Sequence, residues 1–242
     1  MTASSLRRHS TIAPKGRGVT LSALHPAHRS GRSIFPSRVF DPGEVRRVLK
    51  DGHQSRKIGN AVQKGPRRGW PIYTLTLEER ATCPRTCAAW SICYGNNMQA
   101  AERIVAGPEL EAALWTELAA LQAEHPTGFL IRLHVLGDFY SLDYVGLWAR
   151  ALDAFPALAV FGFTARRIET EIGARLNALA EANWSRFSVR FSGRPGPVRA
   201  SRIADGPDDN AITCPAQRGL TDCCATCALC WQSDRTIAFL RH

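Results

Sequence analysis

The chain has 242 residues, of which 45% are hydrophobic, enough to bury the core of one large domain without disulfide staples. It begins without an apolar signal segment and contains no run of 18 apolar residues, so we expect a cytoplasmic protein with no membrane span. The net charge of +10 is unevenly placed, since residues 1–68 hold 15 basic and 3 acidic residues, a net charge of +12.

The basic N-terminal stretch is rich in Gly, Pro and Ser and shows little apolar periodicity before Pro71. We therefore expect residues 1–54 to form a basic, largely disordered arm, with one short helix after Asp41 and Pro42. Such an arm is suited to neutralising phosphates, so nucleic acid is a candidate partner. A tail that only keeps the protein in solution fits the same composition.

From Pro71 onward, strand patterns alternate with helix patterns. Residues 72–77, 129–136, 158–164 and 187–191 have strand composition. Helical spacing is found in three segments. They are residues 108–124, a segment that begins after the capping residue Ser141 and runs to Phe155, and residues 168–182. This alternation predicts parallel β/α units. We expect residues 55–200 to form an α/β core, either a partial or complete barrel or an open doubly wound sheet, and residues 201–242 to form a cysteine-rich segment packed on it.

Each predicted strand has one apolar and one polar face, because side chains alternate along a strand. The apolar faces hold Ile131, Leu133 and Val135, then Phe161 and Phe163, then Val189 and Phe191. The polar faces hold Arg132 and His134, then Gly162 and Thr164, then Ser188, Arg190 and Ser192. Parallel strands covered on both sides are nearly all apolar, so we expect a ligand cavity on the polar faces. An antiparallel sheet with one solvated face is the alternative.

Sites in β/α folds lie at the carboxyl ends of the strands, where this chain has small or polar residues. The residues expected to line a cofactor pocket there are Gly137, Asp138, Thr164, Arg166, Arg190 and Ser192. Arg132, Arg166 and Arg190 would supply cations for a carboxylate or phosphate. Asp138 either accepts hydrogen bonds from a ligand or caps the following helix.

The candidates for catalytic roles are His134, Asp138 and Arg166. His134 and Asp138 with a metal would suit a hydrolytic or nuclease-type enzyme. A lone histidine in a strand is, however, more often hydrogen-bonded within the core.

All eight cysteines fall in two groups, and the long stretch between the groups contains none. The first group is Cys83, Cys87 and Cys93, and the second is Cys214, Cys223, Cys224, Cys227 and Cys230. Ligand sulfurs must converge on their metal, so thiols at short spacing indicate a metalloprotein. The alternatives are disulfides or free thiols, and a single composite site is possible if the C-terminus folds back on the first group.

The two groups offer different ligand sets. The first supplies three thiolates, which leaves a four-coordinate site one ligand short. In the second, the Cys-x2-Cys-x2-Cys run from Cys224 to Cys230 makes four ligands with Cys214, and leaves Cys223 spare or exchanged with Cys224. One or two [4Fe–4S] clusters fit these sets, and structural zinc is the alternative.

The first cysteine loop resembles that of the radical S-adenosylmethionine superfamily, in which three cysteines follow the first barrel strand. The second gap is five residues here, whereas that superfamily has two. Leu136-Gly137-Asp138-Phe139 falls where the superfamily has a motif that holds the amino end of the cofactor. The resemblance implies that Gly137, Asp138, Thr164, Arg166 and Ser192 line a pocket for S-adenosylmethionine.

Three motifs taken together resemble the phage "gene product 88" family, found in phages and plasmids. They are Thr82-Cys83-Pro84 with Cys93-Tyr94-Gly95-Asn96-Asn97, His134-Val135-Leu136-Gly137-Asp138-Phe139-Tyr140-Ser141, and Cys214-Pro215-Ala216-Gln217 with Cys227 and Cys230-Trp231. The likeness spans about residues 55–242 and implies a metal-bound fold in a mobile-element setting, without implying a reaction.

Two functional hypotheses follow from the sequence. The first is an iron–sulfur, radical-S-adenosylmethionine-like enzyme acting on a polar or nucleic-acid-related substrate. The second is a zinc-binding protein that binds nucleic acid through its arm, without catalysis.

Overall fold

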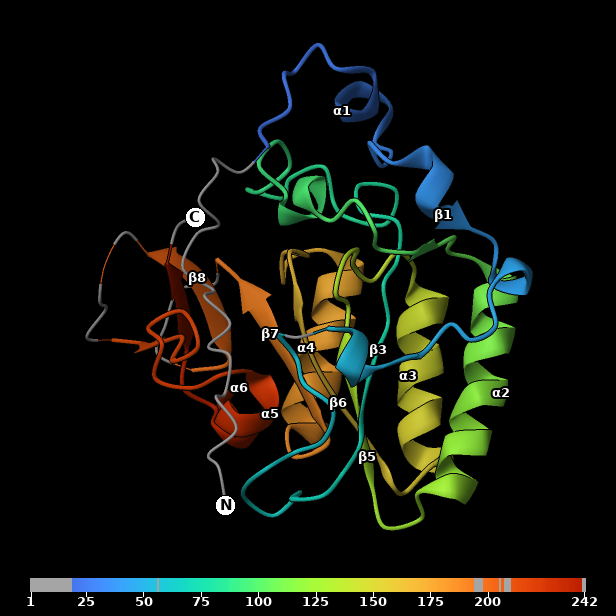
Figure 1. Ribbon diagram of the computed structural model, residues 1–242, viewed down its shortest axis with the longest axis vertical. Coiled ribbons are helices and arrows are strands. Elements are labelled where there is room, and N and C mark those ends of the chain that lie inside the picture. Colours follow the sequence, from blue (N-terminus) through green and yellow to red (C-terminus); the bar gives the residue numbers. More distant parts are fainter. Residues whose placement is uncertain (1–18, 56, 194–197, 205, 207–209, 241–242) are drawn as a thin grey trace, which may run out of the picture.

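The computed structural model describes residues 19–55, 57–193, 198–204, 206 and 210–240. Its main sheet has the strand order β2-β3-β5-β6-β7-β8-β10-β9, in which β2 is antiparallel to β3 and every other pair is parallel (Figure 1). The strands are β2 (Lys50–Asp51), β3 (Ile72–Thr74), β5 (Phe129–Leu133), β6 (Leu158–Thr164), β7 (Phe187–Ser192), β8 (Ala200–Ala204), β9 (Ile212–Thr213) and β10 (Ile237–Leu240). The expected mixed α/β class with parallel pairing is therefore confirmed.

Three long helices connect the central strands: α2 (Pro108–Glu124), α3 (Leu142–Ala154) and α4 (Glu171–Asn183). Each begins at a recognisable signal, since Pro108 lies in the first turn of α2 and Ser141 caps α3 by accepting a hydrogen bond from the Tyr144 amide. Thr170 caps α4 in the same way, so this helix begins at Glu171 and not at Ile168. The short helices are α1 (Pro26–Ser30), α5 (Cys224–Cys227) and α6 (Leu229–Gln232), with 3-10 turns η1 (Pro36–Arg38), η2 (Pro42–Glu44), η3 (Gly52–Gln54) and η4 (Tyr94–Asn97).

The central strands β3, β5, β6, β7 and β8 follow one another across the sheet in chain order. Right-handed connections between such strands place every helix on the same face. The main core accordingly joins Leu114 of α2, Trp148 of α3 and Leu176 of α4 to one face of the sheet. The three long helices that connect the central strands thus share one face, and the sequence-based alternatives of a partial barrel and an open sheet with helices on both faces are distinguished by what covers the other face. The end strands β2 and β9 do not pair with each other in the described part, so the sheet is open and no complete barrel is found.

The opposite face of the sheet is covered by α5 and α6 (Figure 1). A second apolar cluster joins Leu130 and Phe161 of the sheet to Ala225 and Trp231 of the C-terminal segment, and the Phe161 and Trp231 rings lie 4.6 Å apart. Arg190 of β7 reinforces this contact, because its guanidinium donates to the backbone carbonyls of residues 229, 230, 233 and 235. The cysteine-rich segment is thus held on the sheet face that the long helices leave uncovered.

Strand β6 faces the other way from the prediction. Phe161 pairs in register with Arg132, and the Arg132 guanidinium lies over the rings of both Phe161 and Phe163. Val160 joins the helix-covered core in their place. Both faces of this strand are largely apolar, so its composition did not reveal which side faces the helices. The face expected to be a polar hollow is therefore partly aromatic.

His134 also departs from simple alternation. Leu75 donates to the Arg132 carbonyl and accepts from the Val135 amide, three residues further on, whereas a regular parallel ladder spans two. One extra residue therefore lies in this ladder, which is a β-bulge. It turns His134 into the helix-covered core, where its Nε2 lies 2.9 Å from the Tyr144 hydroxyl. The prediction that His134 shares a face with Arg132 is wrong.

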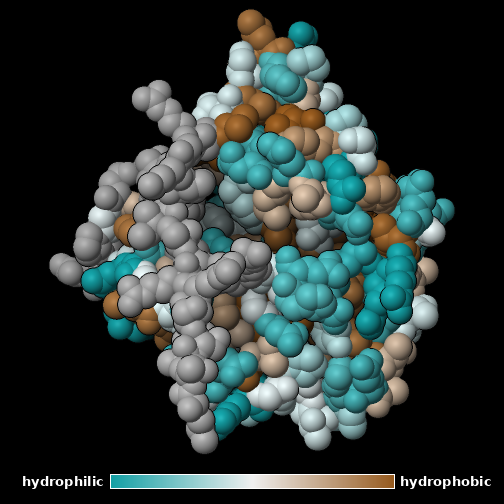
Figure 2. All heavy atoms as spheres, viewed as in Figure 1, coloured by the Kyte–Doolittle hydropathy of each residue, from teal (hydrophilic) through white to brown (hydrophobic). Residues whose placement is uncertain are grey.

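Residues 19–40 and 80–104 form a lobe at the carboxyl ends of the strands, here called the cap (Figure 1). Within it β1 (Val39–Phe40) pairs with β4 (Arg103–Ile104), and the Leu21 amide donates to the Ser91 carbonyl. Residues 19–54 thus make defined contacts in place of the loose arm expected, and residues 1–18 lie outside the described part. Figure 2 shows hydrophobic atoms gathered on the cap, whose exposed apolar side chains include Leu24 and Ile92.

None of the helices in the described ranges combines the length and the apolar character that a bilayer crossing requires.

Candidate metal centre

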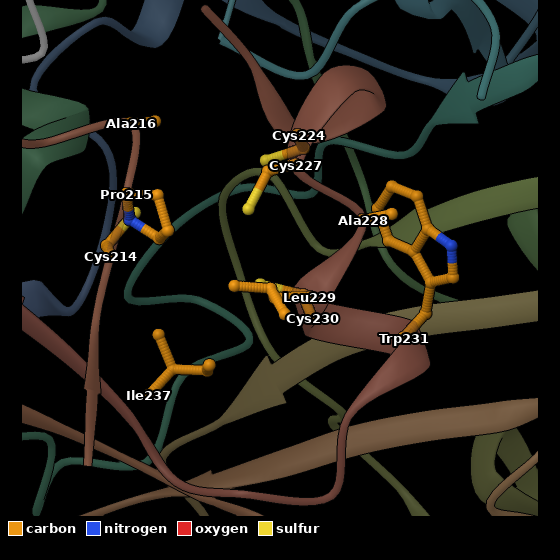
Figure 3. Close-up of a pocket in the computed structure, with 10 residues that line it drawn as sticks. All are labelled: Cys214, Pro215, Ala216, Cys224, Cys227, Ala228, Leu229, Cys230, Trp231 and Ile237. Carbon is orange, nitrogen blue, oxygen red and sulfur yellow. The ribbon is translucent and has the colours of Figure 1, made fainter. Parts of the chain in front are cut away.

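Four of the five C-terminal cysteines line one small cavity. They are Cys214 after β9, Cys224 and Cys227 in α5, and Cys230 in α6. Figure 3 shows these side chains around the cavity, with apolar cover from Leu229, Trp231 and Ile237. The cavity measures about 20 Å³, which is room for about one water-sized atom. Two stretches of the chain, residue 214 and residues 224–230, therefore bring four thiols to one small cavity.

Cys223 has a different position from its neighbour Cys224. It is the N-cap of α5, and its Sγ lies 3.6 Å from the Thr226 hydroxyl. A Cβ atom at Gly59 would meet this sulfur at 2.8 Å, which places the Cys223 side chain against residues 59 and 226 and not in the cavity. The structure therefore separates the two cysteines that the sequence left interchangeable.

Burial favours the neutral thiol at three cysteines of the second group. Burial raises the pKa of Cys224 and Cys227, and raises that of Cys230 to about 11. Two features oppose this rise: the Leu229 amide donates to the Cys227 sulfur, and the Arg190 charge favours the Cys230 thiolate. Thiols bind metals as thiolates, so a cation in the cavity would offset the cost of ionising them.

The first cysteine group lies in the cap, directly beyond β3. Burial raises the pKa of Cys83 and Cys87, and raises that of Cys93 to about 11. Backbone amides oppose this: those of Ala89 and Gly95 donate to Cys87 and Cys93, each from two residues further on, as Leu229 does for Cys227. Amide donors stabilise thiolate sulfur. Cys87 and Cys93 also raise the pKa of Cys83, and Cys87 raises that of Cys93.

Asp138 joins the carboxyl ends of β5 and β6 beside this group. Its carboxylate accepts hydrogen bonds from the Phe139 amide, the Thr164 hydroxyl and the Ala165 amide, each at 2.7 Å. Burial raises the pKa of Asp138 to about 6, although these bonds favour the ionised form. Its charge in turn raises the pKa of Cys83 and Cys87. The predicted Asp138 and Thr164 are thus brought together next to the first cysteine group.

Arg166 and Gly137 belong to the same cluster. The Arg166 guanidinium donates to the carbonyls of Phe139 and Thr82, at 2.7 and 2.8 Å. Gly137 has a φ of +86°, and a Cβ there would meet Leu77 and Thr82 at 2.6 Å. Thr82, which precedes the first cysteine, also accepts a hydrogen bond from the Asp138 amide. The sequence offered no signal for Thr82 beyond its place next to Cys83.

A buried ion network beneath the first cysteine loop was also missed. Glu79 pairs with Arg103 at 2.7 Å, and both side chains are almost fully buried. Arg103 also donates to the Gly95 carbonyl, while Arg80 donates to the Trp90 carbonyl and to the Asn96 side chain. The network thus fixes the backbone around Cys93. Its charges are scattered in the sequence, so no local pattern could reveal it.

The remaining predicted residues lie apart from this cluster. Arg190 is fully buried against the C-terminal segment, and Ser192 is exposed at the end of β7, with its Oγ 3.3 Å from that of Ser201. His134 is buried in the helix-covered core, where burial lowers its pKa to about 3. The ligand roles predicted for these three residues stay predictions.

Within the described ranges, no three His, Cys, Asp or Glu side chains converge closely enough to hold a metal ion as they are placed. Both cysteine groups are nevertheless gathered, and the thiols are free. The donor set fits a thiolate centre, because four thiols face one space and backbone amides donate to four of the eight sulfurs, namely those of Cys83, Cys87, Cys93 and Cys227. To coordinate a metal ion or cluster, the cysteine side chains would have to change their rotamers.

Comparison with known proteins places the chain in a recognisable group. The sequence model of the family described as "Gene product 88" matches residues 47–194, a range that contains the first cysteine group and ends before the second. The "Gene 88 protein" of Mycobacterium phage D29 is 23% identical over 235 residues, which cover 79% of this chain and 91% of the phage protein. No solved structure matches the chain.

Proposed function

The chain belongs to the gene product 88 family, and for this member we propose an iron–sulfur enzyme whose two cysteine groups hold its centres. Cys214, Cys224, Cys227 and Cys230 form a four-thiolate centre on the sheet face. Cys83, Cys87 and Cys93 form a three-thiolate centre at the carboxyl ends of the strands. The observation that carries the proposal is that two stretches of the chain, residue 214 after β9 and residues 224–230 in α5 and α6, bring four thiols to one cavity.

Alternative roles for the thiols explain less. Cysteines that only fill a core need no common cavity, and the described thiols form no disulfides. A thiolate centre accounts for the shared cavity, for the amide donors at four sulfurs and for the nearby charge of Arg190. Hydrogen bonds to the sulfurs and burial are the features by which proteins tune iron–sulfur clusters.

The spacing of the thiols favours clusters over single ions. Ligands of one zinc ion all lie within about 2.3 Å of a point, and no such convergence is found among the described residues. An iron–sulfur cluster has several irons, so its cysteines need only surround it. The gathered but unconverged thiols therefore suit a cluster, with the cavity widened by side-chain rotation.

The first centre would supply the reactive position. Three cysteines leave one iron of a [4Fe–4S] cluster without a protein ligand, where a cofactor such as S-adenosylmethionine can bind. The central strands β3, β5, β6, β7 and β8 follow one another in chain order with their long connecting helices on one face, which is the arrangement of a barrel segment and supports a radical-S-adenosylmethionine-like enzyme. In this role Asp138 and Thr164 hold the strand ends together, and Arg166 fixes the backbone at Thr82, next to Cys83.

A zinc-binding, nucleic-acid-binding protein is the second candidate, and the cavity volume favours it. About 20 Å³ accommodates one ion without widening. The net charge of +12 over residues 1–68 would then supply most of the affinity for phosphates. This candidate needs no reactive position at the first cysteine group.

Metal analysis of protein purified without oxygen tests the proposal. We expect a brown protein that holds roughly four to eight irons per chain, as one or two [4Fe–4S] clusters would give. Colourless protein with stoichiometric zinc would favour the second candidate. Protein that retains neither metal would overturn both.

A further inference from the structure

Four arginines are buried in the described part of the chain, and three of them each make at least two hydrogen bonds within the protein, although Nη1 of Arg80 has no hydrogen-bond partner. Arg103 pairs with Glu79 and donates to two carbonyls. Arg80 donates to the Trp90 carbonyl and to the Asn96 amide oxygen, and Arg190 donates to four carbonyls. The fourth, Arg132, has a different environment.

Arg132 makes a single hydrogen bond, from Nη1 to the Leu133 carbonyl, although only 9% of the residue is exposed. None of the carboxylates in the described ranges lies within ion-pair distance of it. Its Nε and Nη2 atoms make no hydrogen bond within the described part of the chain, and both are accessible to solvent. A buried guanidinium offers up to five donors in a planar fork, and most of those of Arg132 are unused.

The surroundings of Arg132 give it a defined position. It lies on the sheet face opposite the long helices, with its guanidinium 4.8 Å from the centre of the Phe163 ring. The two rings that it lies over contact the C-terminal segment, since the ring centroids of Phe161 and Trp231 are 4.6 Å apart and those of Phe163 and Phe239 are 5.3 Å apart. Arg132 is also the penultimate residue of β5, near the strand end where the cap lies. Arg132 thus stands between the cap and the segment that lines the four-thiol cavity.

We propose that Arg132 binds the oxyanion of a small ligand, a carboxylate or a phosphate, on the sheet face between the cap and the four-thiol cavity. A buried cation without a partner is costly, and an oxyanion would accept hydrogen bonds from the unused Nε and Nη2 donors of the guanidinium group. Stacking on Phe163 holds the fork in one plane, which orders it for two parallel hydrogen bonds. The inference goes beyond the proposed metal centres and does not require them.

The test is titration of the purified full-length protein with inorganic phosphate and, separately, with acetate, followed by calorimetry. We expect one of the two to bind, and the one that binds identifies the class of oxyanion. Replacing Arg132 by Gln should weaken binding roughly 10- to 100-fold, as loss of charged hydrogen bonds does. The control Arg175→Gln removes an exposed arginine of α4, which packs on the other face of the sheet, and should bind as the parent does.

Two further measurements keep the test decisive. If Arg132→Gln does not fold, the Nε resonance of Arg132 in the parent protein is followed during the titration, and we expect it to move. Unchanged binding in Arg132→Gln, an unmoved resonance, or no binding of either anion would overturn the inference. Unchanged anion binding with a shifted visible spectrum would show that Arg132 instead balances the charge of the thiolate centre. Metal content measured on the same samples separates this result from failure of the proposed function.

Discussion

The Thr164 hydroxyl donates to Oδ1 of Asp138 across 2.7 Å and joins the ends of β5 and β6. Both groups are almost fully buried, and Asp138 also holds the amides of Phe139 and Ala165. The strand ends beside the first cysteine group are thus fixed by a carboxylate that the protein itself satisfies. Asp138 therefore joins the ends of β5 and β6 through its hydrogen bonds.

Replacing Thr164 by Val tests the contribution of the Thr164–Asp138 hydrogen bond to stability. The change leaves Oδ1 of Asp138 without its hydroxyl partner, so the free energy of unfolding should fall by about 1–3 kcal/mol. Thr116→Val is the control, because the Thr116 hydroxyl makes an exposed bond to the Ala112 carbonyl, and its effect should stay within about 0.5 kcal/mol. Equal effects of the two changes in urea unfolding would contradict the role given to Asp138.

Gly137 allows the backbone after β5 to approach Thr82. Its φ of +86° disfavours any side chain, and a Cβ would meet Leu77 and Thr82 at 2.6 Å. Gly69 has a similar φ of +90° with nothing within 4 Å, so Gly69→Ala measures the backbone strain alone. Gly137→Ala should destabilise the protein by about 1–3 kcal/mol more than Gly69→Ala, because overpacking adds to strain. Similar losses in both variants would show that the close approach is relieved cheaply.

His134 makes stability depend on pH. Its pKa is about 3 in the folded protein against 6.5 for an unperturbed histidine, because burial disfavours the charged ring. The unfolded chain therefore binds the proton first, so the stabilisation is present above pH 6.5 and is lost as pH falls toward 3. The slope approaches about 1.4 kcal/mol per pH unit.

The variant His134→Gln keeps a neutral side chain at every pH. Urea unfolding at pH 7, 6 and 5 should therefore show a shallower loss of stability for His134→Gln than for the parent. Other titrating groups are common to both proteins and cancel in the comparison. Curves that stay parallel would mean that His134 ionises in the folded protein.

The local parts of the fold could be predicted from the sequence. The interval 108–124 and the Ser141 cap were located correctly, because helical periodicity and capping are local signals. The parallel order of the central strands followed from helix-length connections. Strands β8 and β10 were missed, since five and four residues with no clear alternation reveal little until they pair.

The tertiary parts could not be predicted. The docking of residues 19–54 depends on single contacts such as the ion pair of Arg32 with Glu78 at 2.8 Å, which leave no periodic trace in the sequence. The face of β6 and the bulge at His134 depend on register between strands. For the site, spacing located both cysteine groups, but only the structure shows that Cys224 faces the cavity and Cys223 caps a helix.

That difference between two adjacent cysteines provides the most direct test of the central claim. Cys224→Ser and Cys223→Ser make the same chemical change one residue apart, and only the first removes a thiol from the cavity. Iron and zinc are measured in both variants and in the parent, all purified without oxygen. We predict that Cys224→Ser loses the metal of one centre and that Cys223→Ser keeps the full content. Full metal in Cys224→Ser, or equal loss in both variants, would contradict a centre built on the four thiols of the cavity.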